Sequence, residues 1–211
     1  MNPQRRLLIA AAALVPAAFS PLAALAQQRE AFIEIKPPQP TEADANKIEV
    51  VEFFWYGCPH CYNLEPSLEA WVKKLPSDAE FKRIPAVFNA RWAHDAAIFY
   101  AFEALGVVDK LHRPFFDAIH RDHLNTENRA ALDEWVGKNG VDAKKFEDAL
   151  KSFGVQSKVR RASQLTVASK IDGTPALTVQ GRYMIGGSES MLDTASQLIA
   201  MVRKDKVASR K

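Results

Sequence analysis

Cysteine is scarce in this sequence: only Cys58 and Cys61 occur among 211 residues. Small exported domains that depend on disulfides for stability carry many more, which excludes a disulfide-stapled scaffold. A disulfide stabilises a protein mainly by closing a long loop, and two cysteines separated by two residues close almost none. The pair therefore predicts chemistry rather than structural support.

An excess of charge of one sign is also missing, because the formal net charge is only +3. Part of that charge lies in the first residues, and part lies in a basic tail that we interpret as a solvated terminus. The tail carries Lys204, Lys206, Arg210 and Lys211. This charge balance gives no indication of nucleic-acid binding.

Long apolar runs are absent after the first 26 residues, so no membrane span is predicted there. The N-terminus carries Arg5 and Arg6, an apolar stretch at 7–19 and small residues ending at Ala26. This pattern predicts a secretory signal peptide over residues 1–26, cleaved after about Ala26. Two arginines alone leave Sec and twin-arginine export both open. Either route predicts an exported protein.

The two cysteines fall where a strand gives way to a helix. The near-continuous apolar run 48–55 predicts a central strand covered on both faces. Gly57 breaks this run, and Pro59 suits the first turn of a helix, where a missing amide is tolerated. Pro66 is expected to kink that helix.

The remaining pattern predicts two more strand regions around a helical insertion. Residues 92–171 change to helical spacing and predict about five helices, whose aromatic residues we interpret as core packing. Gln180-Gly181 is a hairpin signal between two short apolar runs. The other expected elements are short strands at 32–35 and 81–88, hairpin strands at 176–179 and 182–185, and a final amphipathic helix from Met191.

The two cysteines lie in the segment Glu52-Phe53-Phe54-Trp55-Tyr56-Gly57-Cys58-Pro59-His60-Cys61. This segment resembles the active-site segment of the DsbA family, whose members are periplasmic oxidases. Gly173-Thr174-Pro175-Ala176 falls where that family carries its cis-proline loop. The segment departs from other members at Trp55-Tyr56-Gly57. The resemblance implies an α/β protein with a thioredoxin-like fold and an inserted all-helical domain. The implied division is a thioredoxin-like part at 27–90, a helical insertion at 91–160 and a second thioredoxin-like part at 161–211.

Disulfide exchange needs an accessible thiolate and a second thiol that resolves the mixed disulfide. At the start of a helix, Cys58 lies among unpaired amides and near the positive end of the helix dipole, which lowers a thiol pKa below about 8.5. Cys61, one turn further on, is predicted to be the buried resolving thiol. His60 is predicted to donate a hydrogen bond or carry charge near Cys58, the alternative being an exposed loop histidine. Pro59 completes the predicted catalytic motif.

Glu52 interrupts the apolar strand, and a carboxylate buried there has a raised pKa. We expect it to take a proton from Cys61 during exchange, with Arg83 as its partner, although a solvent-exposed carboxylate and a surface arginine remain open. The resemblance implies that Thr174 and Pro175 form the substrate-binding loop that faces Cys58. The alternative is an ordinary trans turn.

The resemblance implies a periplasmic, monomeric thiol:disulfide oxidoreductase. Such a protein donates its Cys58–Cys61 disulfide to reduced, unfolded exported proteins through a mixed disulfide. A quinone-linked membrane oxidase of the DsbB type then reoxidises it, and no cofactor beyond the redox-active disulfide is expected.

Three alternatives remain at this point. A thioredoxin-like reductase or isomerase uses the same motif, although residues 27–46 are too short for a separate dimerisation domain. A non-catalytic periplasmic binding or chaperone module is the second. A zinc-binding module is the third, but the cysteines supply only half of a tetrahedral site. His112, His120 and His123 are interpreted as surface residues, the last two on one helical face.

Overall fold

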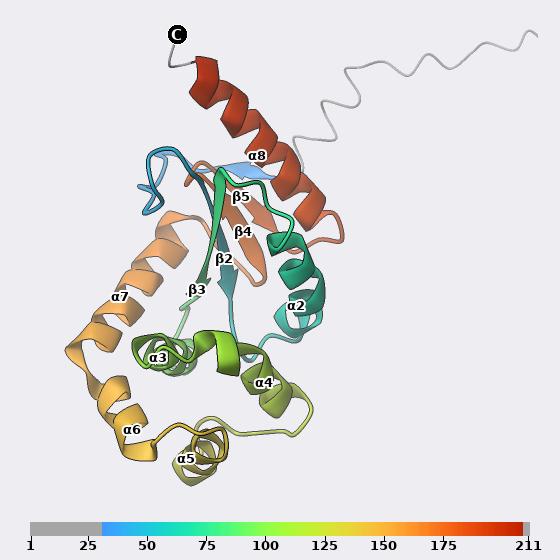
Figure 1. The fold of residues 1–211 in the computed structure, drawn as a ribbon. Coiled ribbons are helices and arrows are strands. Elements are labelled where there is room, and N and C mark those ends of the chain that lie inside the picture. Colours follow the sequence, from blue (N-terminus) through green and yellow to red (C-terminus); the bar gives the residue numbers. More distant parts are fainter. Residues whose placement is uncertain (1–30, 209–211) are drawn as a thin grey trace, which may run out of the picture.

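The computed structural model describes residues 31–208, so the predicted signal peptide lies outside the described residues. One five-stranded sheet has the order β1-β5-β4-β2-β3, and helices surround it (Figure 1). The strands are β1 (Ile33–Glu34), β2 (Ile48–Phe54), β3 (Ala79–Pro85), β4 (Ala176–Val179) and β5 (Tyr183–Gly186). The helices are α2 (Pro59–Val72), α3 (Ala90–Ala104), α4 (Val108–His120), α5 (Arg129–Lys138), α6 (Ala143–Lys151), α7 (Phe153–Ala168) and α8 (Met191–Ala208). In this part of the chain, no helix has the length and apolar character needed to cross a bilayer.

The central strand is β2, as the apolar run predicts. All seven of its residues are buried. It pairs in parallel with β3 on one side and antiparallel with β4 on the other. The strand ends one residue earlier than predicted, because the chain turns after Phe54 and the Cys58 amide donates to the Trp55 carbonyl at 2.9 Å.

The prediction of a strand at 81–88 is wrong at both ends, since β3 spans Ala79–Pro85. Pairing with the whole of β2 draws Ala79 and Glu80 into the sheet opposite Ile48 and Glu49. Beyond the strand, the Val87 amide donates a hydrogen bond to the Thr166 hydroxyl of α7 at 3.1 Å, so this amide pairs with a helix side chain and not with another strand. The end of β3 is therefore set by contacts that are remote in the sequence.

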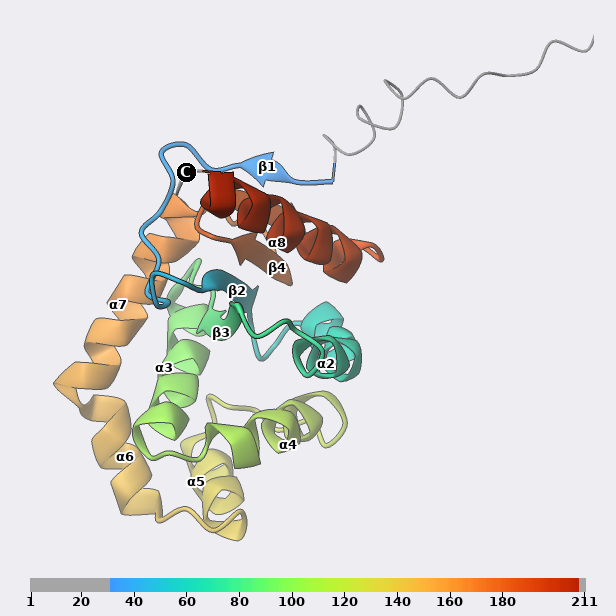
Figure 2. The ribbon, with the colours of Figure 1, turned by 45° about the horizontal axis from the view of Figure 1, so that its top comes forward.

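Two units and the short strand β1, which pairs with β5, build the sheet layer. The first is β2-α2-β3, a parallel pair joined through a helix, and the second is the β4-β5 hairpin followed by α8. The hairpin turns at Gln180 and Gly181, which have φ values of 54° and 60°. Together they form the expected thioredoxin-like layer. Helix α8 packs against β4 and β5, and Figure 2 shows it beside β4.

The predicted helical insertion is confirmed as five helices, α3 to α7, between β3 and β4. Its core gathers the aromatic rings of Phe102, Phe115 and Phe146 and extends to Phe54 and Tyr56 at the end of β2. The aromatic residues therefore do pack, as predicted, and they join the insertion to the sheet. The predicted boundary at residue 160 falls inside α7, and the division into 27–90, 91–160 and 161–211 stays a prediction.

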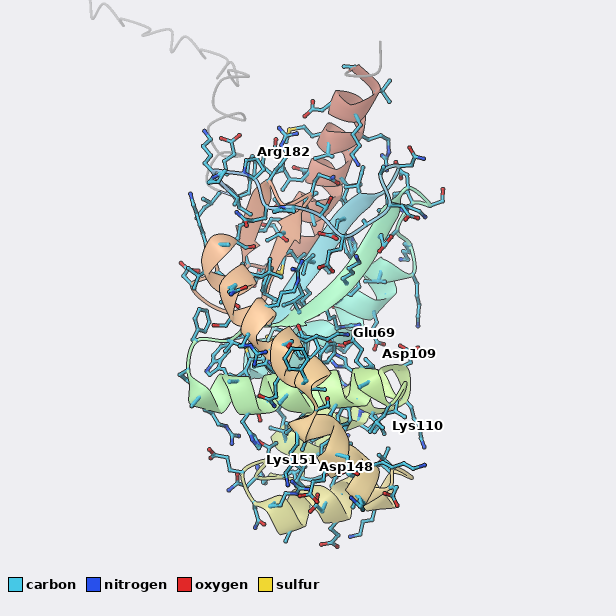
Figure 3. The ribbon with its side chains drawn as sticks, turned by 90° about the vertical axis from the view of Figure 1, so that its left-hand side faces the viewer. Glu69, Asp109, Lys110, Asp148, Lys151 and Arg182 are labelled. Carbon is cyan, nitrogen blue, oxygen red and sulfur yellow. The ribbon has the colours of Figure 1, made fainter. Side chains whose placement is uncertain are left out.

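Charged side chains cover the outer face of the insertion. Figure 3 shows Asp148 and Lys151 on α6, far from Arg182 at the other end of the molecule. Asp148 pairs with Lys144 at 3.0 Å and Lys151 pairs with Glu147, both with i,i+4 spacing. Exposed pairs of this kind stabilise a helix by only about 0.3–0.5 kcal/mol each. The fold therefore depends on its apolar cores.

Gly181 is the hairpin glycine whose replacement should destabilise the protein most. Its φ is positive, and a Cβ there would lie 2.2 Å from the Gln39 carbonyl oxygen. We predict that Gly181→Ala lowers the free energy of unfolding by about 2 kcal/mol or more. Urea denaturation measures this. The control is Gly137→Ala in α5, where a Cβ meets nothing within 4 Å and the expected change is a gain of about 0.4–1 kcal/mol. Equal midpoints for the two variants would contradict the assignment.

Candidate active site

Cys58 is the N-cap of α2, and Pro59 occupies the first turn. The Cys58 sulfur accepts a hydrogen bond from the Cys61 amide at 3.3 Å. It also lies 3.3 Å from the Thr174 carbonyl oxygen, to which the protonated thiol donates. Both cysteines are free thiols here. Cys58 keeps 6% of its surface exposed and Cys61 keeps none, so Cys58 is the cysteine that solvent reaches.

The two sulfurs have opposite acidities. The Cys61 side chain hydrogen-bonds Cys58 and, against the effect of burial, lowers the pKa of Cys58 to about 5. A side-chain hydrogen bond from Thr174 and the amides of Cys61 and His60 act in the same direction. Burial, the hydrogen bond to Cys58 and the charges of Glu52 and Cys58 raise the pKa of Cys61 far above its ordinary value. At neutral pH the pair therefore holds one thiolate, on Cys58, and one thiol.

The predicted substrate loop lies directly opposite Cys58. A cis peptide bond joins Thr174 to Pro175, immediately before β4. A pocket of about 510 Å³ extends from this loop along α2. Its lining includes His60, Leu64, Thr174, Pro175, Gly187 and Met191.

His60 contributes to this site through its backbone. Its amide is one of the groups that lower the pKa of Cys58, after the larger effect of the Cys61 side chain. The side chain is exposed and lines the pocket. A catalytic role for the His60 ring stays a prediction.

Glu52 is fully buried, and Arg83 is its partner. The Arg83 Nε donates to Glu52 Oε2 at 3.1 Å, and Glu52 Oε1 has no hydrogen-bond partner among the described residues. Burial and the nearby charge of Glu65 raise the pKa of Glu52 to about 8, although Arg83 opposes both. Glu52 is therefore largely protonated at neutral pH. Proton exchange with Cys61 stays a prediction.

Sequence reasoning missed two buried groups at this site, Glu65 and His112. Arg83 Nη2 donates to Glu65 Oε2 at 3.2 Å, and His112 Nε2 lies 3.3 Å from Glu65 Oε1. The interpretation of His112 as a surface residue is wrong, because only 4% of it is exposed. One signal was present in the sequence: Glu65 shares the buried face of α2 with Cys61 and Leu68, at i, i+4 and i+7 spacing.

The other two histidines also differ from the prediction of a shared helical face. Helix α4 ends at His120, and His123 follows it with a φ of 57°. His120 is half-buried, and its Nε2 lies 2.8 Å from the Tyr56 carbonyl oxygen. His120 therefore contacts the chain two residues before Cys58, whereas His123 is exposed.

The departure at Trp55-Tyr56-Gly57 has a structural reason. The Trp55 ring stacks on Trp92 with centroids 4.3 Å apart, and its Nε1 donates to Asp95 at 2.8 Å. A Cβ on Gly57 would lie 2.3 Å from the Trp55 ring. Gly57 therefore leaves the space that this tryptophan fills beside the active-site segment.

The chain resembles known proteins in both sequence and structure. A family model described as DSBA-like thioredoxin domain matches residues 68–199. The thiol:disulfide interchange protein DsbA of Burkholderia cepacia is 42% identical over 175 residues, 82% of each chain. The protein of that name from Bordetella parapertussis is 42% identical over 205 residues, 94% of this chain and 97% of the relative. The chain belongs to the DsbA family.

Solved structures agree with membership of the DsbA family. The crystal structure of Pseudomonas aeruginosa DsbA has a TM-score of 0.77 and 34% identity, covering 86% of this chain and 95% of its own. DsbA from Xylella fastidiosa has a TM-score of 0.77 and 31% identity, covering 82% and 95%. The family match begins at residue 68, after the two cysteines, so the motif and the match are independent observations. The thioredoxin-like fold with a helical insertion is confirmed.

The Cys58 thiolate of this DsbA-family protein should titrate at about pH 5, as measured by thiolate absorbance of the reduced protein. Cys61→Ala removes the side-chain hydrogen bond to Cys58 and should raise the midpoint by about one pH unit. Cys61→Ser keeps a hydroxyl donor and should stay closer to the parent protein. A parent midpoint near the ordinary value of about 8.5 would contradict the description of this site.

Proposed function

We propose that this protein is a periplasmic disulfide oxidase, which donates its Cys58–Cys61 disulfide to reduced exported proteins. The observation that carries the proposal is the opposite acidity of the two sulfurs, with the low-pKa sulfur beside Thr174. Disulfide exchange proceeds through thiolates, and a sulfur of low pKa is the better leaving group.

The disulfide exchange takes place in two steps, each a thiolate attack on a disulfide sulfur. A substrate thiolate attacks the Cys58 sulfur, the Cys58–Cys61 bond breaks, and Cys61 leaves as a thiolate that takes up a proton. A second substrate thiolate then attacks the substrate sulfur of the mixed disulfide, and Cys58 leaves as a stable thiolate. The substrate loses two electrons and two protons. The protein gains both electrons and one proton, and the other proton goes to solvent.

The low pKa of Cys58 also sets the direction of the reaction. Each pH unit by which it lies below neutrality stabilises the reduced protein by about 1.4 kcal/mol, which raises the potential of a two-electron couple by about 30 mV. A protein that favours its dithiol form passes its disulfide on. This direction favours an oxidase over a thioredoxin-like reductase or isomerase.

Glu52 is the proton donor and acceptor for the Cys61 sulfur in this scheme. Its protonated carboxyl gives a proton to the departing Cys61 thiolate and is then reprotonated by solvent. The carboxylate form, in equilibrium with solvent, takes the Cys61 proton when Cys61 attacks during reoxidation. The burial of Glu52 and its electrostatic effect on Cys61 support this role.

The substrate segment is proposed to lie extended beside Cys58, along the Thr174–Pro175 loop. The Thr174 carbonyl already accepts from the reacting thiol, and hydrogen bonds between such a loop and the backbone of an extended chain form without regard to its sequence. The pocket that continues from this loop along α2 supplies room for neighbouring side chains. Such a site suits many different unfolded proteins.

The cellular context is proposed from the sequence and the family. A signal peptide at 1–26, cleaved after about Ala26, delivers the chain to the periplasm. A DsbB-like quinone-linked membrane oxidase restores the disulfide, and the protein acts as a monomer.

The zinc alternative needs ligands beyond the two cysteines, and two histidines that could supply them have other partners. His112 is hydrogen-bonded to Glu65 and Tyr56, and His120 contacts the Tyr56 carbonyl. The geometry therefore favours redox chemistry at the cysteine pair.

Trapping experiments test the role of each sulfur. We predict that Cys58→Ser abolishes exchange, because the low-pKa nucleophile and leaving group is lost. Cys61→Ser should instead accumulate mixed disulfides, because the resolving thiol is missing. The trapping partner is an unfolded protein that carries a disulfide: the remaining cysteine attacks it, one substrate thiolate leaves, and mass spectrometry of the mixed disulfide identifies the linked cysteine. Substrate attached to Cys61 in the Cys58→Ser variant, with none attached to Cys58 in the other, would reverse the assignment.

The stability of the two redox forms should differ with pH. The Cys58 pKa is about 5 in the folded dithiol and about 8.5 in an unfolded chain. A lowered folded pKa adds stability that is complete above the unfolded value and is lost as pH falls through the folded value. The reduced form should therefore unfold at higher urea than the oxidised form at neutral pH, and this advantage should shrink from about pH 8.5 to about pH 5. A more stable oxidised form at pH 7 would refute the oxidase direction.

A further inference from the structure

One guanidinium group serves two buried carboxylates beneath the active site. Arg83 donates from Nε to Glu52 and from Nη2 to Glu65, and neither carboxylate side chain has any exposed surface. Glu52 comes from β2 and Glu65 from α2, beside which α4 lies (Figures 1 and 2). Two carboxylates that share one cation do not both ionise easily, because each charge disfavours the other. Something must decide which of them keeps the proton.

His112 of α4 supplies an additional hydrogen bond to only one of them. Its Nε2 lies 3.3 Å from Glu65 Oε1, and its Nδ1 lies 3.0 Å from the Tyr56 hydroxyl. An ionised carboxylate only accepts hydrogen bonds, so Nε2 carries the proton and Nδ1 accepts from Tyr56. Burial lowers the pKa of His112, against the effect of Glu65, and this agrees with a neutral ring.

The two carboxylates are therefore unequally stabilised as anions. Glu65 receives hydrogen bonds from Arg83 and His112, which outweigh burial and lower its pKa. One Glu52 oxygen accepts a hydrogen bond from Arg83, and the other is buried with no partner among the described residues. The other titratable groups that act on this cluster are Cys58, Cys61, Tyr56, Glu69 and Asp95.

We propose that His112 is a positioning residue of the exchange reaction, which holds Glu65 as the anionic partner of Arg83 and thereby keeps the shared proton on Glu52. The inference rests on the proposed function, in which Glu52 gives that proton to the departing Cys61 thiolate. The step is a transfer from the Glu52 carboxyl to the Cys61 sulfur, which leaves a carboxylate and a thiol, and solvent returns the proton to Glu52. His112 itself remains neutral throughout.

The unaltered protein tests the first part of the proposal. Nitrogen NMR of the His112 ring in the reduced protein should show a neutral imidazole with its proton on Nε2 at about pH 6 to 8, where an ordinary histidine titrates. An imidazolium ring, or a proton on Nδ1, would overturn the proposal. This measurement does not depend on the folding of any variant.

Carbon NMR of the Glu52 carboxyl tests the second part. The parent protein should show a midpoint at about pH 8. His112→Phe removes the donor to the Glu65 anion, so Glu65 competes better for the shared proton. The Glu52 midpoint should therefore fall by about one pH unit, the size expected for the loss of a hydrogen bond to a charged group. His112→Gln keeps an amide donor and should restore the parent midpoint. Tyr56→Phe is the matched control: it removes the other partner of His112 and should leave Glu52 unchanged.

A folded His112→Phe protein with the parent Glu52 midpoint would refute the role of His112. If that variant fails to fold, His112→Gln and the ring measurement on the parent protein decide. Neither titration needs a substrate, so a failure of disulfide exchange in the trapping experiments would refute the proposed function without changing these results. A stopped-flow pH profile of Cys61 protonation then links the two, because it should follow the Glu52 midpoint in each variant.

Discussion

The hydrogen bonds that end on the Cys58 sulfur are the interactions on which the site depends. They form because β2 stops at Phe54 and α2 begins at Pro59, which makes Cys58 the N-cap of the helix. A cap accepts the otherwise unpaired amides of the first turn, and a thiolate accepts them better than a thiol does. The N-cap position thus makes the Cys58 thiol acidic. Cys61 lies one turn deeper and remains the protonated partner.

The rest of the fold holds that junction in place. β2 is buried along its whole length, so the point at which the active-site segment leaves the sheet is fixed. The insertion fixes the segment from the other side, because α4 contacts the Tyr56 hydroxyl through His112 and the Tyr56 carbonyl through His120. The β4 end of the sheet brings the Thr174 carbonyl to the sulfur. The helical insertion is therefore part of the active site rather than an appendage.

The buried charges of Glu52, Glu65 and Arg83 are difficult to explain by stability. Burying an ion pair costs about as much free energy as the pairing returns, and an apolar replacement of similar volume is often neutral or stabilising. These groups lie on β2, α2 and β3, which meet beneath the two cysteines. Their position favours a role in proton movement, which an apolar core does not provide.

Local signals in the sequence predicted what local chemistry determines. Gly57 and Pro59 marked the strand-to-helix junction, Gln180 and Gly181 marked the hairpin, and helical spacing indicated the insertion. Contacts between distant segments were not predictable in this way. The Thr166 hydroxyl accepts the Val87 amide beyond the end of β3, from a helix 79 residues further on, and His112 meets Glu65 across 47 residues.

The Thr174–Pro175 loop was predicted from a family resemblance, because its own residues fit an ordinary turn equally well. The helical pattern of α4 also does not say that its one buried polar ring faces α2. Such pairings depend on how the elements pack, which periodicity does not record.

The equilibrium of this protein with glutathione tests the central claim most directly. In a buffer poised at about −240 mV at pH 7, a stabilised Cys58 thiolate should leave the protein predominantly in the dithiol form. A thioredoxin-like reductase, with a potential of about −270 mV, would remain predominantly oxidised in the same buffer. A predominantly oxidised protein would contradict the conclusion that the acidity of Cys58 makes this chain a disulfide donor.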